Sequence, residues 1–63
     1  MGIPAGKRRE EIRRLLLESG DRVLSAGELA ARFDVSRQII VGDIAILRAG
    51  GEEILSTARG YRL

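Results

Sequence analysis

The stretch LAARFDVSRQIIVGDIAIL, Leu29–Leu47, contains two short apolar patterns at helical spacing that meet at the residues DVS, 34–36. Two helices joined by three or four residues form a helix-turn-helix motif. Ala30 is small where the second helix must come close, and Val35 is expected to fill the joint. Glycine is common at such a joint because the backbone turns toward left-handed geometry there. Aspartate tolerates that geometry better than most residues, so Asp34 is compatible with the motif.

The local signals at both helices of the motif are clear. Ser25 and Glu28 have the spacing of a capping box, which predicts a helix from about Ala26 to Asp34. Ser36 is the next N-cap candidate, and the third helix of the chain is predicted over 37–49, ending at Gly50-Gly51. Its inward stripe is Ile40, Ile44 and Leu47. Asp43 lies beside this stripe and is expected to pair with an arginine inside the domain.

The segments around the motif complete one domain. Residues 1–6 read as a disordered lead-in, and KRREEIRRLLLES, 7–19, as an amphipathic helix that ends at Gly20. DRVLS, 21–25, is short and extended. After the motif, the spacing of apolar residues is no longer helical. Strands are predicted at Ile54–Ser56 and Tyr61–Leu63, on either side of the turn Thr57–Gly60. The prediction is a mainly α domain over 7–63, with three helices and a small β-hairpin in a two- or three-stranded wing: a winged helix-turn-helix.

Composition narrows the function classes. The chain has 63 residues, no cysteine and no histidine, so disulfides and zinc sites built from His and Cys are excluded. We expect no metal, no cofactor, no membrane span and a cytoplasmic location. The carboxylates lie on exposed helix faces, and so short a chain lacks room for a deep cleft, so an enzyme is not expected. Net charge is only +2, but the cations are ten arginines and one lysine. Arginine binds phosphate bidentately.

Four segments resemble one known family: RREEI, LLLESG, GELAARFDVSRQIIVGDIAILR and ILSTARGYRL. They look like the N-terminal domain of bacterial niacin-responsive transcriptional repressors, which carry a C-terminal 3H domain. They are similar, less closely, to the DNA-binding domains of biotin repressors and DeoR-type regulators. The resemblance covers about Lys7 to Leu63 and implies a DNA-binding domain of a transcriptional repressor. The helix Ser36–Ala49 would enter the major groove of double-stranded DNA, and the turn Thr57–Gly60 would contact the flanking backbone.

Carried onto this sequence, the resemblance gives the DNA-binding candidates Ser36, Arg37, Gln38, Val41, Gly42 and Arg59. A serine hydroxyl at a helix N-terminus can bind phosphate, arginine can bind guanine or phosphate, and glutamine can pair with adenine. Val41 can touch a thymine methyl or belong to the core. Each polar candidate also has an ordinary structural role, as an N-cap, a surface residue or a turn residue. The cations of 7–9 fit a solvated helix start better than a DNA contact, and Arg48 fits the negative end of the helix dipole.

The helix that should read DNA departs from the family pattern. Its solvent face is Gln38, Gly42, Ala45 and Ala49, which is nearly bare of long side chains. Either the backbone approaches DNA closely at Gly42, or base reading has been lost. The alternative function is therefore a stand-alone scaffold or protein-interaction module with weak or no DNA binding. Convergence of Arg59 with the N-terminus of this helix favours DNA binding, and divergence favours the alternative.

The tail also departs from the full-length repressors. Small or charged residues stand at positions such as Gly50 and Glu52, where those repressors tend to carry bulky apolar side chains. This suits a domain that stands alone in water. We expect a weak homodimer at most, or a C-terminal effector domain that is missing here.

Overall fold

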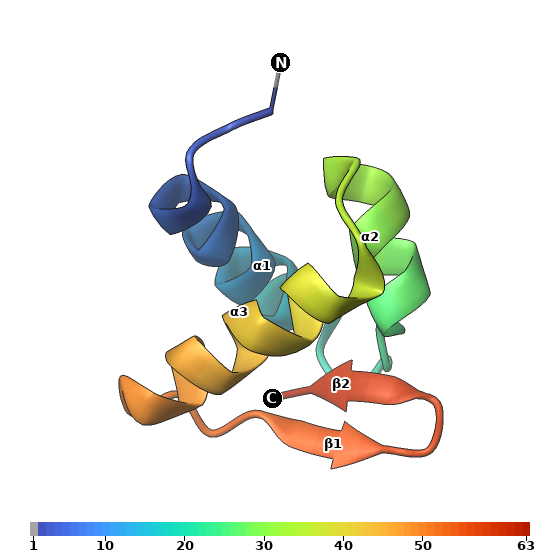
Figure 1. The fold of residues 1–63 in the computed structure, drawn as a ribbon. Coiled ribbons are helices and arrows are strands. Elements are labelled where there is room, and N and C mark those ends of the chain that lie inside the picture. The colour runs from blue at the N-terminus through green and yellow to red at the C-terminus, as the bar shows by residue number, and fades with distance from the viewer. Residues whose placement is uncertain (1) are drawn as a thin grey trace.

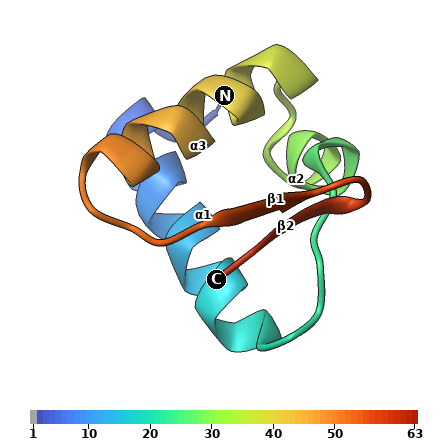
Figure 2. The same ribbon diagram turned by 90° about the horizontal axis from the view of Figure 1, so that it is seen from below.

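Three helices and one hairpin follow one another along the chain. The computed structural model describes residues 2–63 and contains α1 (Ala5–Ser19), α2 (Ala26–Phe33), α3 (Arg37–Ala49), β1 (Leu55–Thr57) and β2 (Gly60–Arg62). The helices gather on one side, and the hairpin lies beneath them (Figure 1). Seen from below, the hairpin extends from α1 toward α2 (Figure 2). The predicted mainly α winged helix-turn-helix is confirmed.

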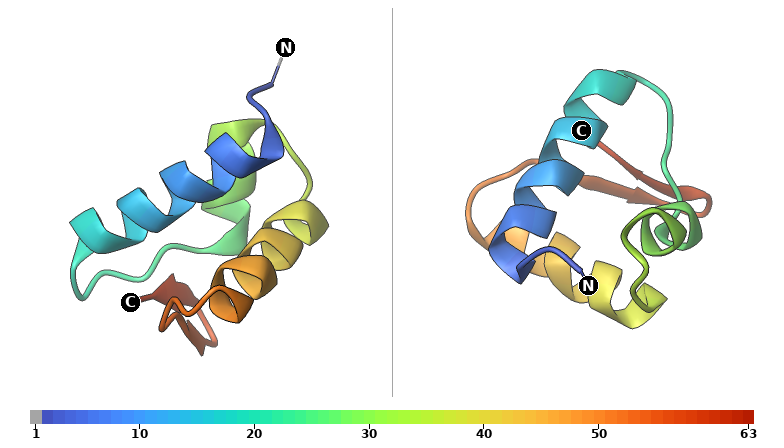
Figure 3. Two further views of the ribbon diagram at one scale, coloured as in Figure 1. Left: turned by 90° about the vertical axis from the view of Figure 1, so that its left-hand side faces the viewer. Right: turned by 90° about the horizontal axis from the view of Figure 1, so that it is seen from above.

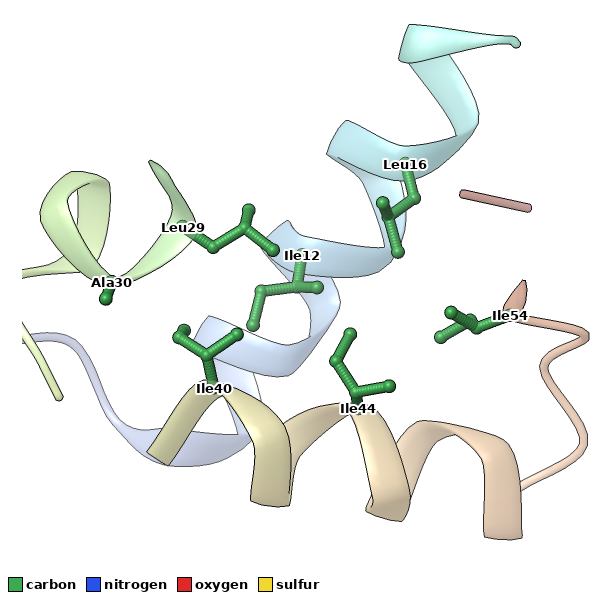
Figure 4. Packing of buried hydrophobic residues seen from close by; sticks show 7 residues of the cluster. All are labelled: Ile12, Leu16, Leu29, Ala30, Ile40, Ile44 and Ile54. Atoms are coloured by element: carbon green, nitrogen blue, oxygen red, sulfur yellow. The ribbon is translucent and has the colours of Figure 1, made fainter. Parts of the chain in front are cut away.

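The core is built from one apolar stripe of each helix. Seven buried side chains form it (Figure 4): Ile12, Leu16, Leu29, Ala30, Ile40, Ile44 and Ile54. The inward stripe predicted for α3 is confirmed, since Ile40 and Ile44 are buried and Leu47 packs against them. Phe33, Val35 and Leu47 are half-buried and pack against the cluster. Val35 fills the joint as expected.

The joint between α2 and α3 depends on Asp34. Its backbone is left-handed, with φ 55° and ψ 49°, as the sequence predicts for this position. The turn is closed by the Val35 amide, which donates to the Ala30 carbonyl at 3.0 Å. Ser36 then caps α3, because its hydroxyl accepts a hydrogen bond from the Ile39 amide at 3.2 Å. These local bonds set the angle between the two helices of the motif.

A buried ion pair joins α1 to α3. Asp43 is 2% exposed, and its two carboxylate oxygens accept from Arg8 Nε at 2.6 Å and Arg8 Nη2 at 3.0 Å. Arg9 Nη1 lies 3.4 Å from the same carboxylate. The predicted pairing of Asp43 inside the domain is therefore confirmed. The interpretation of residues 7–9 as a solvated helix start is wrong for Arg8 and Arg9, since both bind Asp43.

The first helix begins two residues earlier than predicted. Pro4 occupies the N-cap position with φ −59°, and its carbonyl accepts from the Arg8 amide at 2.9 Å. Proline presets φ near this value, which favours a helix start directly after it. The helix therefore includes Ala5 and Gly6, two residues that were predicted to lie in the lead-in.

At the other side of the molecule, the far end of α1 lies near the C-terminus of the chain (Figure 3).

The wing is shifted by one residue from the prediction. β1 and β2 are antiparallel, with Leu55 opposite Arg62 and Thr57 opposite Gly60, so the loop is only Ala58 and Arg59. Ile54 is in the core rather than in the strand. The short extended segment before α2 contributes one isolated bridge, Leu24 to Tyr61, as a rudimentary third strand.

Arg48 connects α3 to the wing. Its Nε donates to the Ile54 carbonyl at 2.9 Å, and its Nη2 donates to the Ser56 hydroxyl. The interpretation of Arg48 as a partner of the helix dipole alone is therefore incomplete. The sequence could not show this contact, because it depends on how the chain turns back after Gly51.

Replacing Gly60 by alanine should loosen the wing. Gly60 has φ 149°, and a methyl group there would lie 2.3 Å from the Leu24 carbonyl oxygen. We expect a loss of about 2–3 kcal/mol in the free energy of unfolding, from backbone strain and displacement of the Leu24 bridge. Urea denaturation measures it. Gly42→Ala is the matched control, because nothing lies within 4 Å of its added methyl and helix propensity should raise stability by about 0.5–1 kcal/mol. Equal effects of Gly60→Ala and Gly42→Ala on the free energy of unfolding would contradict a specific requirement for glycine at position 60.

Removing Asp43 alone should lower the stability of the domain strongly. Replacing both Asp43 and Arg8 with apolar residues should lower it less. Asp43→Leu leaves two arginines beside an apolar site, and we expect a loss of about 2–4 kcal/mol. The double variant Arg8→Met, Asp43→Leu should recover part of that loss, because no arginine at position 8 is left without its partner. Glu10→Gln is the control, since its pair with Arg13 is exposed. Urea denaturation of these variants, the unmodified protein and the single variant Arg8→Met checks this, and additive effects of the two single substitutions would refute a coupled pair.

Candidate nucleic-acid interface

A cleft of about 310 Å³ separates the wing from the first turn of α2. Its walls come from three elements that are distant in sequence: the start of α2, the start of α3 and the turn of the wing. The lining residues are Ser25, Ala26, Gly27, Arg37, Ser56, Thr57, Ala58, Arg59, Gly60 and Tyr61. Arg37 and Arg59, two of the sequence candidates, therefore lie on one concave surface. Arg59 thus converges with the start of α3, the arrangement expected for DNA binding.

The wing turn is organised by Thr57. Its hydroxyl accepts from the amides of Arg59 and Gly60, each at 3.1 Å, and donates to the Gly60 carbonyl at 3.0 Å. A threonine hydroxyl that satisfies the backbone of the next residues stabilises a tight turn. Arg59 is exposed at the tip of this turn. The side chain is thus carried by a short, hydrogen-bonded loop rather than by a free one.

The opposite wall is the N-terminus of α2. The Ser25 hydroxyl accepts from the Glu28 amide, and Glu28 Oε1 accepts from the Ser25 amide, both at 3.0 Å. The predicted capping box is confirmed. The hydrogen bond from the Ser25 backbone lowers the pKa of Glu28 below its ordinary value of 4.5. The carboxylate therefore stays ionised to lower pH than an ordinary glutamate, and the capping box persists with it.

Arg37 lies over the first turn of α2 rather than pointing along α3. A methyl group placed on Gly27 would be 3.0 Å from a terminal guanidinium nitrogen of Arg37. The missing side chain at Gly27 therefore makes room for the guanidinium beside the helix N-terminus. Sequence reasoning missed Gly27. A glycine in the first turn of a helix is a weak signal, and nothing in the sequence connects it to a residue ten positions later.

The two arginines of the cleft differ in their pairing from those of α1. Ion pairs hold Arg8, Arg9, Arg13 and Arg14 on α1 and Arg62 on β2. Within residues 2–63, neither Arg37 nor Arg59 has a carboxylate within 4.0 Å of its guanidinium. Their charges are therefore available to an outside anion. The small net charge of the chain conceals this local excess.

The remaining candidates lie on α3 outside the cleft. Ser36 is exposed at the N-cap, and its hydroxyl bonds the Ile39 amide. Gln38, Val41 and Gly42 are exposed along the helix, so Val41 is not part of the core. No neighbouring atom explains the glycine at position 42, since the space around it is open.

The sequence comparisons agree with this architecture. A family model described as an HTH domain matches residues 8–62. The chain is 48% identical over 48 residues to the probable transcription repressor NiaR of Thermotoga maritima, and 41% identical over 56 residues to the transcription repressor NadR of Bacillus subtilis. These matches cover 76% and 89% of this chain but only 27% and 31% of the relatives. The chain thus spans about a third or less of the curated relatives it matches.

The comparisons confirm the predicted relationship to this class of bacterial repressors. Separately, no helix within residues 2–63 has the length and apolar character needed to cross a membrane. The fold, the family match over nearly the whole chain and the two related repressors lead to one assignment. The chain belongs to the HTH domain family and has the winged helix-turn-helix fold.

Proposed function

We propose that this domain binds double-stranded DNA as part of a transcription repressor, with α3 in the major groove and the wing turn Thr57–Gly60 on the flanking backbone. The observation that carries the proposal is the cleft in which Arg37 and Arg59 lie together without carboxylate partners in the described chain. The printed names of the two relatives, both transcription repressors, support the regulatory role.

The two arginines suit a phosphate better than a base. Arg37 is held beside the N-terminus of α2, where backbone dipoles already favour an anion. Arg59 reaches the same cleft from the wing. A phosphate of the duplex backbone that enters this cleft would meet both guanidinium groups. Such contacts fix the position of a protein on DNA without reading sequence.

Base contacts are then left to the exposed side of α3. Gln38 and Val41 are the candidates for base edges, and Ser36 and the first turn of α3 for a phosphate. Gly42 leaves the backbone free to approach the groove. Under this proposal the domain needs no metal or cofactor and performs no catalysis. The predicted cytoplasmic location also fits, because bacterial DNA lies there.

A single domain should bind weakly. Repressors with a helix-turn-helix commonly bind paired half-sites as dimers, and two linked domains gain from effective concentration. We propose that the domain alone forms at most a weak homodimer, and that strong binding requires an additional dimerising or effector region of the kind that the greater length of the relatives accommodates.

A protein-interaction module is the second candidate. The exposed apolar side chains Val41 and Ile46 on α3 and the net charge of +2 favour it. The two functions differ in their dependence on salt. Phosphate contacts release counterions and weaken steeply as salt rises, whereas apolar contacts between proteins do not.

The domain should bind a labelled random-sequence duplex with a slope of log affinity against log salt of about −3 to −4, as expected for about four phosphate contacts. Arg37→Ala and Arg59→Ala should each lower the affinity and reduce the slope by about one contact. Fluorescence anisotropy between about 50 and 200 mM salt measures both quantities.

The matched control is Arg32→Ala. Arg32 is an exposed arginine at the other end of α2 and lines hollows on the α1 side instead of the cleft. The Arg32→Ala variant removes the same charge as the other two variants but outside the cleft. The slope of log affinity against log salt should therefore stay unchanged. Equal losses in all three variants would assign the binding to overall charge. No binding at the lower salt would favour the protein-interaction module.

A further inference from the structure

The outer face of α3 offers almost no hydrogen-bonding side chains. The exposed residues along it are Gln38, Ile39, Val41, Gly42, Ala45, Ile46 and Ala49. Val41 is 50% exposed and Ile46 is 53% exposed. Two long cations of α3 are engaged elsewhere: Arg48 is bonded to the wing, and Arg37 lies over the first turn of α2 in the cleft. With both arginines directed away, Gln38 is the one polar side chain left on this face among the residues that the structure describes.

The major groove presents one apolar group at base edges, the 5-methyl of thymine. The other base edges present hydrogen-bond donors and acceptors. An apolar face would remove water from these groups without replacing their hydrogen bonds, which is unfavourable. Glutamine matches adenine through its N6 and N7 atoms. Apart from Arg37, whose side chain lies in the cleft, this face of apolar side chains and one glutamine is thus complementary to A·T pairs.

The position of Val41 links this face to the cationic cleft. Arg37 and Val41 are four residues apart, so they lie one above the other on α3. Ala45 continues the same row by another turn. When Arg37 and Arg59 hold a backbone phosphate, Val41 is the apolar side chain next to that contact. Gly42, beside this row, adds no side chain that would hold the helix away from the groove.

We infer that α3 recognises thymine methyl groups, with Val41 and Ala45 contacting neighbouring methyls and Gln38 pairing with an adjacent adenine. This inference rests on the proposed function and names the base pairs that the domain prefers. The half-site is A·T-rich where α3 enters, and discrimination comes from methyl burial rather than from arginine–guanine pairs. The flanking cations and the groove-sized helix make DNA, rather than a protein, the occupant of this face.

The test begins by enriching a randomised duplex pool on the domain at about 50 mM salt. The enriched pool is then copied once with thymine and once with uracil, which differ only by the 5-methyl group. Anisotropy gives the dissociation constant of each copy. We expect weaker binding to the uracil copy by about fourfold for each buried methyl, or about 15-fold for two. Sequencing should show adjacent A·T pairs in the enriched site.

Variants test whether the preference for thymine over uracil comes from contact with Val41. Val41→Ser should reduce the uracil-to-thymine ratio of dissociation constants by about fourfold. Leu17→Ser is the control, because Leu17 is 55% exposed on α1, away from the cleft, and should leave the ratio unchanged. Arg37→Ala should weaken both copies equally and also preserve the ratio.

The outcomes distinguish the two proposals. Equal binding of the thymine and uracil copies by the unmodified domain would overturn methyl recognition and leave DNA binding intact. A ratio that persists in Val41→Ser would overturn the assignment of Val41. Failure of any pool to enrich, with no binding to either copy, would overturn the proposed function and this inference together.

Discussion

The burial of Asp43 between two arginines of α1 is the constraint on which the orientation of α3 depends. A domain of 63 residues has few buried positions, and seven of them form the apolar cluster while one holds a carboxylate. A carboxylate at a buried position is costly unless it is paired and hydrogen-bonded. A bidentate ion pair adds direction, because Arg8 binds both carboxylate oxygens only over a narrow range of helix orientations. The pair therefore turns the opposite side of α3, with Gln38 and Val41, toward solvent.

The same pairing shapes the electrostatics of the molecule. Arginines on α1 are neutralised by Asp43 or by glutamates of their own helix, so this helix contributes little free positive charge. Arg37 and Arg59 lie at the far side, on either wall of the cleft. Two cations without a carboxylate partner in the described chain therefore face one cleft where α2, α3 and the wing meet. A net charge of +2 describes the whole chain and hides this distribution.

Local signals in the sequence were sufficient for most of the fold. The caps at Ser25 and Ser36, the left-handed Asp34 and the inward stripe of α3 are each decided by neighbouring residues, and all were predictable. The contacts between distant segments were not. Three features depend on tertiary packing. They are the pairing of Asp43 with Arg8 and Arg9, the position of Arg37 over Gly27, and the contacts of Arg48 with the wing. The one-residue shift of the strands has the same origin, since Ile54 is drawn into the core.

The central claim is that DNA contacts the cleft and the outer side of α3 at the same time. Amide chemical shifts of the nitrogen-15-labelled domain, followed while a duplex is added at low salt, test this most directly. The account predicts shifts at residues 26–28, 36–42 and 57–60, where three elements face one surface, and unchanged signals along the solvent side of α1 around Leu17. Shifts confined to α1, or no shift at any residue, would contradict it.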